Sequence, residues 1–265
     1  DLHAALAFRL AAEHLTTLLP AATRSYLAPH FDHARRLLEG LEAQGLGRWA
    51  DRVRVIHRHQ PLRAPDLDPV IFECVQTAVL EGRRLSIGYR RRGEKAVRRY
   101  RVDPLALVFK EGVPYLLGTV SKEAYLVQLS VHRLVSARLR DEACVVPPGF
   151  DLDAYIAGGG FGFSLGPTPL ELVARLDPDA GATLFETPLT LDQRIEQAPD
   201  GWLRLSATVP DTRQLRVWLR GFGALVEVLA PDGLRAEMAA EARATCARYD
   251  ADPPARNPTG DRRSS

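Results

Sequence analysis

Between Arg83 and Val146, apolar and polar side chains alternate with a period of two, interrupted only by short turns. Leu85, Ile87 and Tyr89 stand at alternate positions, separated by small or basic residues. Because successive side chains of a β-strand point to opposite faces, this pattern predicts strands with one buried face. Similar runs cover 98–103, 105–109, 115–120, 125–131 and 134–139, with turns at Arg92-Gly93, Glu111-Gly112 and Ser121-Lys122. Short strands joined by tight turns predict a small barrel.

Positive charge is concentrated at the start of this region. Residues 83–101 hold nine basic side chains and the single acid Glu94, whereas totals of 35 basic and 33 acidic residues leave 26 and 32 elsewhere. A basic surface on a slightly acidic body favours a phosphate-bearing partner. The alternative is a solvated strand face without a ligand. Arg90, Arg91 and Arg92 are interpreted in this second way, as a solvated turn.

Helical patterns precede the alternating region. Apolar residues recur at helical spacing over 2–19, where Pro20 ends the run, and again from about Pro29 to Gln44. Residues 49–59 alternate like a strand, and residues 67–81 are expected to form a helix with Gly82 as its C-terminal cap. The first two helices are interpreted as a connector.

A second unit follows the strands. Phe150–Ile156 is expected to be a short helix capped by Asp151, and Gly158–Gly166 a flexible, glycine-rich linker. From Leu170 to Tyr249 the expected order is βαββαβα, which fits a ferredoxin-like α+β module. The Pro-, Arg- and Ser-rich tail 251–265 is expected to be disordered.

Composition and motifs exclude several classes of protein. No apolar run approaches the roughly 20 residues of a membrane span, and the first residues do not show the basic and then apolar pattern expected of a signal peptide. Cys74, Cys144 and Cys246 are far apart and odd in number, which favours a reducing, cytoplasmic setting. The only Met is Met238 and residue 1 is Asp, so the chain is expected to be processed, trimmed or a fragment.

Neither catalysis nor metal binding is expected. GxSxG, HExxH and other catalytic signatures are missing, and Gly158-Gly159-Gly160 lacks the Lys-Ser/Thr of a phosphate loop. The pairs His30/His33 and His57/His59 have neither a nearby Cys nor a clear carboxylate third ligand. We therefore expect a non-enzymatic protein without cofactor or metal.

The ordered set of motifs resembles the WYL-domain proteins over roughly residues 1–250. Pro114-Tyr115-Leu116 stands where that family carries Trp-Tyr-Leu, and Trp218-Leu219 with Gly221-Phe222-Gly223 resembles the extension that follows the WYL domain. The other matching pieces are Ile87-x-Tyr89, Arg101-Val102-x-Pro104-Leu105-x-Leu107-Val108, His132-Arg133-Leu134, Phe150-Asp151-Leu152, Leu215-x-x-Trp218 and Val226-Glu227-Val228-Leu229-x-Pro231.

The resemblance implies an α+β protein, with its parts in a set order. The parts are a helical linker region (1–66), an Sm-like or SH3-like WYL barrel (67–146), a linker (147–168), a ferredoxin-like C-terminal extension (169–250) and the tail (251–265). Proteins of this family are mostly bacterial transcriptional regulators with an N-terminal winged helix-turn-helix. This chain resembles that layout without the DNA-binding head. The resemblance also implies that the barrel senses a ligand, with nucleic acid or nucleotides favoured.

Two residues depart from the family pattern. Pro114 replaces the Trp, which affects packing, and Ser130 stands where many members have a basic residue. The substitution at Ser130 removes one expected phosphate contact and leaves the identity of the ligand open.

The candidate ligand-binding residues combine arginines with rings. Arg99 and Arg101 share one strand face, and Arg133 is expected to join them when the barrel closes; planar guanidinium groups bind phosphate through paired hydrogen bonds. Tyr89, Tyr115 and His132 are candidates for stacking on a base, with packing as the alternative for the tyrosines. The full predicted set is Arg99, Arg101, Arg133, Tyr89, Tyr115, His132 and Ser130.

Our leading hypothesis is the ligand-sensing, dimerising region of a transcriptional regulator. Its partners would be a nucleic acid or nucleotide ligand, a second copy of the chain in a homodimer, and DNA through the missing helix-turn-helix. One alternative is a stand-alone protein that binds single-stranded nucleic acid. Another is an accessory protein that regulates an enzyme by contact.

Overall fold

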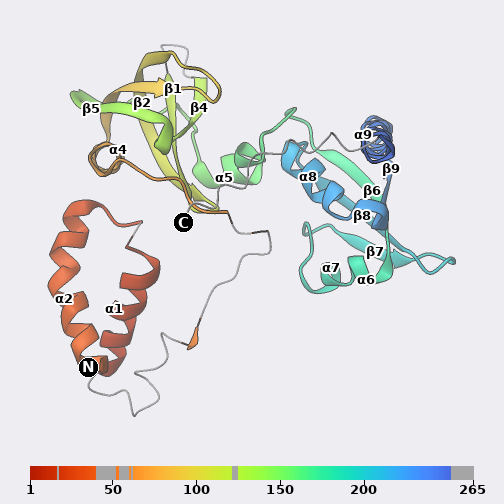
Figure 1. The fold of residues 1–265 in the computed structure, drawn as a ribbon, viewed down its shortest axis with the longest axis horizontal. Coiled ribbons are helices and arrows are strands. Elements are labelled where there is room, and N and C mark those ends of the chain that lie inside the picture. The colour runs from red at the N-terminus through yellow and green to blue at the C-terminus, as the bar shows by residue number, and fades with distance from the viewer. Residues whose placement is uncertain (17, 40–51, 54–59, 61, 121–124, 252–265) are drawn as a thin grey trace, which may run out of the picture. The chain divides into compact units, whose positions relative to one another are not determined.

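The computed structural model describes residues 1–16, 18–39, 52–53, 60, 62–120 and 125–251. The chain divides into two compact units, Asp1–Phe150 and Asp151–Ser265. Helices and antiparallel sheets occur in both units, so the protein is α+β as expected (Figure 1). Within the described residues, no helix is both long enough and apolar enough to cross a membrane.

The N-terminal helices form an antiparallel pair, α1 (Leu2–His14) and α2 (Ala21–Glu39) (Figure 1). Their small core consists of Ala5, Ala34 and Leu38, with Phe8 packed against it. The predicted start of the second helix was wrong, because α2 begins eight residues before Pro29 and contains it. Residues 21–28 include alanine, arginine and leucine, which favour a helix enough to accommodate the missing N–H of the proline. The predicted strand 49–59 lies almost wholly outside the described residues.

Helix α4 (Pro69–Glu81) begins two residues after the predicted start at 67 and has the predicted C-terminal cap, Gly82. The Asp68 side chain accepts hydrogen bonds from the backbone N–H groups of Val70 and Ile71 at 2.9 and 3.1 Å. Gly82 ends the helix in the left-handed conformation, with φ 61°. The side-chain amide of Gln76 donates to the carbonyl of Leu19 at 3.0 Å, which links α4 to the segment between α1 and α2.

Five antiparallel strands form the first sheet, in the order β4-β3-β2-β1-β5. Both residues of the Glu111-Gly112 turn have positive φ, 52° and 78°, as a two-residue hairpin between twisted strands requires. The two runs predicted at 98–103 and 105–109 form one strand, whose register shifts between Pro104 and Ala106. The strands are β1 (Arg83–Arg90), β2 (Val97–Lys110), β3 (Val113–Val120), β4 (Tyr125–Ser130) and β5 (Leu134–Ala143), with the short 3-10 helix η1 (Val131–Arg133) before β5.

Strands β4 and β5 lie at opposite edges of the sheet and do not pair with each other in the described residues. The sheet is therefore open, and the predicted closed barrel is not seen. Its core lies on one face, where Leu85, Ile87 and Val102 meet Phe72 and Val75 of α4. Burial of this apolar face supplies the main stabilisation of the sheet.

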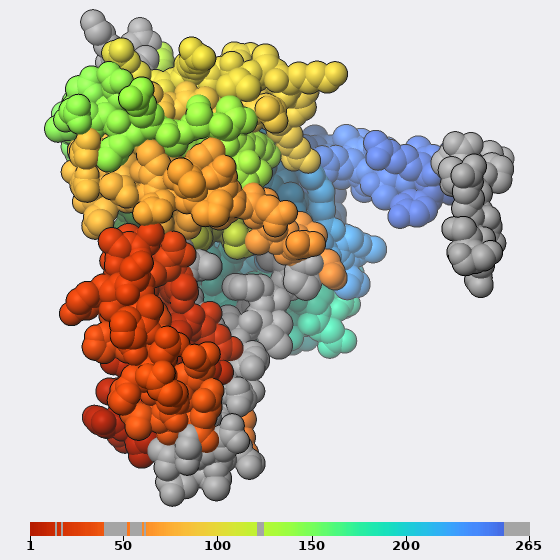
Figure 2. Space-filling view, turned by 60° about the vertical axis from the view of Figure 1, so that its left-hand side comes forward, coloured from red at the N-terminus to blue at the C-terminus, as the bar shows by residue number. Residues whose placement is uncertain are grey.

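The second sheet has the order β7-β8-β6-β9, and all of its strand pairs are antiparallel. Its core joins Leu172 and Leu205 of the strands to Leu219 and Leu234 of the helices. Residues 242–250 are exposed, and this end of α9 stands clear of its unit in Figure 2. The elements confirm the predicted βαββαβα order: β6 (Leu170–Leu176), α6 (Pro178–Gly181), α7 (Thr183–Glu186), β7 (Arg194–Gln197), β8 (Leu203–Val209), α8 (Arg213–Gly221), η3 (Gly223–Leu225), β9 (Val226–Ala230) and α9 (Asp232–Asp250).

The glycine-rich segment before this sheet is not the flexible linker that its composition predicts. The predicted short helix, α5 (Leu152–Ala157), is capped by Asp151, and η2 (Gly160–Gly162) follows it. A Cβ on Gly159, whose φ is +86°, would lie 2.6 Å from the Thr212 side chain, and Leu165 donates its N–H to the Asp211 carbonyl at 2.8 Å. The glycines therefore permit close packing against the start of α8.

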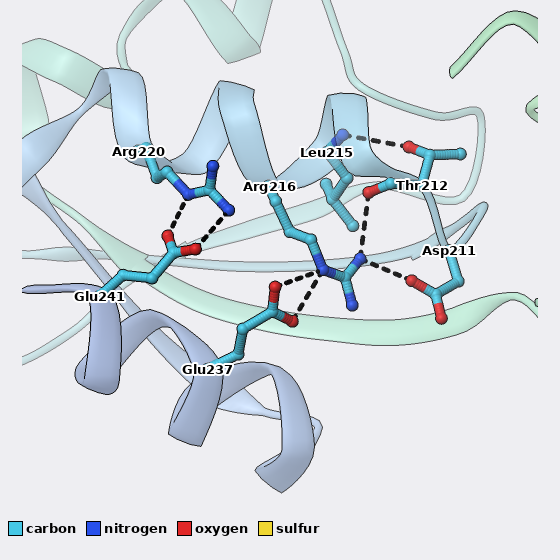
Figure 3. Close-up of polar contacts among 7 residues, drawn as sticks. All are labelled: Asp211, Thr212, Leu215, Arg216, Arg220, Glu237 and Glu241. Carbon is cyan, nitrogen blue, oxygen red and sulfur yellow. Dashed lines mark hydrogen bonds and ion pairs between the residues drawn. The ribbon is translucent and has the colours of Figure 1, made fainter. Parts of the chain in front are cut away.

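An ion-pair network joins α8 to α9 (Figure 3). Arg216 Nε donates to Glu237 at 2.8 Å, and Nη1 donates to Asp211 at 2.6 Å and to the Thr212 carbonyl at 3.0 Å. One turn later, Arg220 pairs with Glu241 at 2.7 Å, but both of these side chains are over 40% exposed. Arg216 is 8% exposed, so its contacts are made with little competition from water.

We predict that Arg216→Ala lowers the free energy of unfolding of the C-terminal unit by about 1–3 kcal/mol, because it leaves partly buried acceptors unpaired. The matched change Arg220→Ala breaks an exposed pair and is expected to cost no more than about 1 kcal/mol. Chemical denaturation of both variants measures the difference. Equal effects would contradict the distinction between the two pairs.

Candidate functional site

The outer face of β2, β1 and β5 gathers arginines over small residues. In the strand register, Ser86 of β1 lies opposite Arg101 of β2 on one side and Arg138 of β5 on the other. Gly88 of β1 likewise lies between Arg99 of β2 and Ser136 of β5. Tyr100, Val102 and Ala137 alternate with these residues and pack on the core face. The predicted common face of Arg99 and Arg101 is confirmed, and β5 adds a second basic edge.

These residues form an open groove with a volume of about 600 Å³, which we call the arginine groove. A Cβ on Gly88 would lie only 2.7 Å from the Ser136 hydroxyl, so a larger residue there would crowd the floor. The polar outer-face residues that line the groove are Ser86, Gly88, Arg99, Arg101, Ser136, Arg138 and Arg140.

The arginines of the groove are only partly neutralised. Arg140 pairs with Glu142 at 3.3 Å, whereas Arg99, Arg101 and Arg138 are exposed and make no ion pair within the described part of the chain. The pKa of Glu142 is lowered by a hydrogen bond from its own backbone N–H and by Arg140, with a smaller contribution from Arg101. The groove therefore has guanidinium groups available for an anion.

An ion pair lies next to the groove, two residues along β1 from Ser86 and two along β2 from Arg101. Arg84 Nε donates to Asp103 at 2.8 Å, and the same carboxylate accepts the backbone N–H of Val145 at 3.0 Å. Asp103 thus neutralises Arg84 and ties the end of β5 to β2.

A second hollow, of about 220 Å³, lies at the turn between β1 and β2. We call it the turn hollow. Its lining contains four arginines, Arg90, Arg91, Arg92 and Arg133. The other lining residues are Gly93, Glu94, His132 and Val135. The structure therefore separates Arg133 and His132 from Arg99 and Arg101, which were expected to share one cluster. It also places Arg90, Arg91 and Arg92, expected to form a solvated turn, around a hollow.

His132 is held in an environment that disfavours its charge. Its Nδ1 atom is buried and has no hydrogen-bond partner among the residues that the structure describes. Burial lowers the pKa of His132, and the neighbouring charge of Arg133 lowers it further. At neutral pH the imidazole is therefore uncharged.

The remaining predicted residues lie away from both hollows. Tyr89 is 7% exposed and belongs to the core of the first sheet, which agrees with the packing alternative. Tyr115 and Ser130 pair across β3 and β4; Tyr115 is half-buried and Ser130 is buried. None of the three lines the arginine groove or the turn hollow.

Sequence reasoning missed the β5 side of the groove. Ser136, Arg138 and Arg140 stand two residues apart, which is the signal of a shared strand face. That spacing could have identified them as one set, but the pairing of β5 with β1 was needed to place them opposite Arg99 and Arg101.

The histidine pairs do not form a metal centre in the described residues, where no group of three or more His, Cys, Asp or Glu side chains is arranged to hold an ion. His30 instead stacks on Phe8, with ring centroids 5.6 Å apart. His57 and His59 lie outside the described residues. Cys74, Cys144 and Cys246 are not in disulfides.

Comparison with known proteins identifies two domains. The family model described as the WYL domain matches residues 70–139, and the one described as the WCX domain matches residues 168–245. No curated protein matches the sequence.

Two solved structures are similar in part. Proteasome accessory factor B/C (PafBC) of Arthrobacter aurescens is 24% identical with a TM-score of 0.33, over 71% of this chain and 29% of that one. A CRISPR Cas-related protein is 13% identical with a TM-score of 0.42, over 68% of this chain and 51% of that one. The chain thus spans about half or less of the length of each.

We predict that His132 titrates below its ordinary pKa of 6.5. The unfolded chain then binds more protons than the folded one near that pH, so this group's contribution to stability is lost as pH falls below about 6.5. An NMR titration, with the His132 resonance assigned through a His132→Gln variant, measures the value. Titration at or above 6.5 would contradict the burial of the ring.

Proposed function

Since this chain is a WYL-domain protein that also carries a WCX domain, we propose that it is the ligand-sensing region of a bacterial transcriptional regulator. The proposed ligand is phosphate-bearing, either a single-stranded nucleic acid or a nucleotide, and it binds in the arginine groove. In this proposal DNA contact belongs to a helix-turn-helix outside these 265 residues.

The observation that carries the proposal is a set of three arginines that have no ion-pair partner in the described part of the chain and that stand over a floor of small residues. Arg99, Arg101 and Arg138 converge on Ser86 and Gly88 from two neighbouring strands. A guanidinium group stays charged at any physiological pH and donates two parallel hydrogen bonds to a phosphate. The small floor lets a phosphate approach the sheet closely enough to meet arginines from both sides.

The width of the groove favours a single strand. Arg101 and Arg138 are separated by one intervening strand, so their backbones are about 10 Å apart. A duplex is too wide to lie between them, whereas the backbone of one strand fits. Arg99 and Arg101 stand two residues apart on β2, about 6.6 Å, and so could contact successive phosphates.

The groove is expected to read the phosphate backbone and not the bases. Tyr89 is in the core, and neither Tyr115 nor His132 lines the groove. The aromatic residue that does line the groove, Tyr100, packs against the core of the first sheet, so we expect few stacking contacts with bases. Contacts to phosphate carry little sequence information.

We further propose the domain boundaries expected from the sequence. The open five-stranded sheet and α4 make up the proposed WYL domain over 67–146, in place of the expected closed Sm-like barrel, and the order β7-β8-β6-β9 fits a ferredoxin-like extension over 169–250. Residues 1–66 serve as a helical linker region and 147–168 connect the two domains. The proposed setting is cytoplasmic and the proposed role non-enzymatic.

Sensing requires that ligand binding changes an equilibrium between two arrangements. A ligand can do this only when it binds one arrangement more tightly than the other. We propose a homodimer as the element with two arrangements, with exposed apolar side chains of the C-terminal unit such as Phe163, Leu165 and Val217 contributing to its contacts.

The dimer makes a separate prediction. Multi-angle light scattering of the 265-residue chain is expected to give twice the mass of 29.3 kDa at micromolar concentration. A monomeric mass that persists as the concentration is raised would contradict the dimer and leave ligand binding in the groove to be judged independently.

Ligand binding is tested with short labelled single-stranded DNA and RNA, by fluorescence anisotropy at several salt concentrations. We expect binding to weaken with salt, because arginine–phosphate contacts release counterions. The Arg99→Ala/Arg101→Ala variant is expected to weaken binding at least about tenfold and to reduce the salt slope by about one for each lost contact. Duplex DNA is expected to bind more weakly than the single strand.

A matched control removes the same charge elsewhere. Arg194 and Arg243 are exposed and lie in the C-terminal unit, so Arg194→Ala/Arg243→Ala lowers the net charge equally without touching the groove. Equal weakening by both double variants would reduce the effect to overall charge and contradict a defined site. No binding of any oligonucleotide or nucleotide at about 100 micromolar protein would overturn the proposed ligand class.

A further inference from the structure

The lining of the turn hollow is strongly basic, with four arginines and one acid. Arg90, Arg91 and Arg92 reach it from the end of β1 and the turn, and Arg133 reaches it from η1. The acid in its lining, Glu94, is paired with Arg98 at 3.2 Å. Four arginines therefore line a hollow of about 220 Å³, and the carboxylate in that lining is already paired with Arg98.

A bulge in β5 brings the turn hollow next to the arginine groove. The register between β1 and β5 shifts between Gly88 and Tyr89, so Val135 is the extra residue and both Val135 and Ser136 are exposed. Val135 lines the turn hollow, whereas Ser136 lines the groove. A Cβ on Gly88 would lie 3.1 Å from the Val135 side chain, so the two sites adjoin along the outer face of β1.

The turn hollow lies where the strand β1 ends, so it marks one end of the basic face. β1 finishes at Arg90, which pairs with Val97, and the chain reverses there through the turn that lines the hollow. A strand that lies along β1 in the arginine groove thus meets a cluster of arginines where the sheet stops.

The arginine groove and the turn hollow suit different kinds of phosphate group. A phosphodiester within a strand has one negative charge, whereas a terminal phosphate monoester has about −1.5 to −2 near pH 7 and three strong acceptor oxygens. Several guanidinium forks around one small hollow match the second group better than the first. His132, which also lines the hollow, has a buried Nδ1 atom that no described residue hydrogen-bonds.

We propose that the turn hollow binds a terminal phosphate monoester, and that it thereby selects strands whose end is phosphorylated. This inference rests on the proposed function, because the rest of the strand lies in the arginine groove. A 5′-phosphate, a 3′-phosphate and the phosphate of a free mononucleotide share this chemistry, and the test separates them.

The test compares three six-nucleotide thymidine strands that carry a 5′-phosphate, a 3′-phosphate or no terminal phosphate. Each is titrated with the full 265-residue chain at fixed salt and pH 7.5. One of the two phosphorylated strands is expected to bind at least about tenfold more tightly than the unphosphorylated strand, which corresponds to about 1.4 kcal/mol. Thymidine monophosphate and inorganic phosphate serve as competitors and are expected to be weaker than that strand.

Variants show whether tighter binding of a phosphorylated strand comes from the turn hollow or from the extra negative charge of the ligand alone. Arg92→Ala/Arg133→Ala is expected to abolish the preference and to leave binding of the unphosphorylated strand within about threefold. Arg91→Glu/Arg92→Glu changes only exposed residues and gives the same test should loss of Arg133 impair folding. Arg194→Ala/Arg243→Ala is expected to retain the preference.

Other outcomes would contradict binding of a terminal phosphate in the turn hollow. Equal binding of the three strands, or a preference that survives both turn variants, overturns the inference and leaves the arginine groove as the ligand site. Inorganic phosphate that competes as well as the phosphorylated strand also overturns it, because the hollow would then bind a free anion. Failure of all three strands to bind overturns the proposed function together with the inference.

Discussion

The register of β2, β1 and β5 is the constraint on which the rest of the first unit depends. Because Leu85 pairs with Val102 and Leu139, every second position on these strands turns towards α4. The intervening positions, Ser86 and Arg101 among them, must then face outwards. A shift by one residue would bury the arginines and expose the core, so the free energy of apolar burial holds the basic face in place.

Holding several arginines on one face requires that their repulsion stays small. Ser86 separates Arg101 from Arg138, and exposure to water screens the charges. Asp103 neutralises Arg84 at the edge of the cluster. A ligand that brings negative charge would complete this arrangement, which is why an unpaired basic face over a glycine and serine floor suggests an anion site more than a stable solvated surface.

Local signals predicted those parts of the fold that depend on neighbouring residues. Gly82 ends α4 as expected, and the elements of the second unit follow the predicted βαββαβα order, because capping and alternation act within a few residues. Where tertiary packing decided, prediction failed. Pro29 is accommodated inside α2, and the glycines at 158–162 pack against Tyr155 and Thr212 instead of forming a flexible linker.

The α+β class, the order of the elements and the shared face of Arg99 and Arg101 could all be predicted from the amino-acid sequence, since hydrophobic period and turn residues encode these features locally. Which basic residues meet depends on how distant strands pair. Arg138 and Arg140 joined the groove through the pairing of β5 with β1, and η1, which precedes the bulge at Val135, places Arg133 and His132 in the lining of a separate hollow. Strand pairing and a one-residue register shift connect residues nearly 40 positions apart, such as Arg101 and Arg138, and such contacts leave no trace in local spacing.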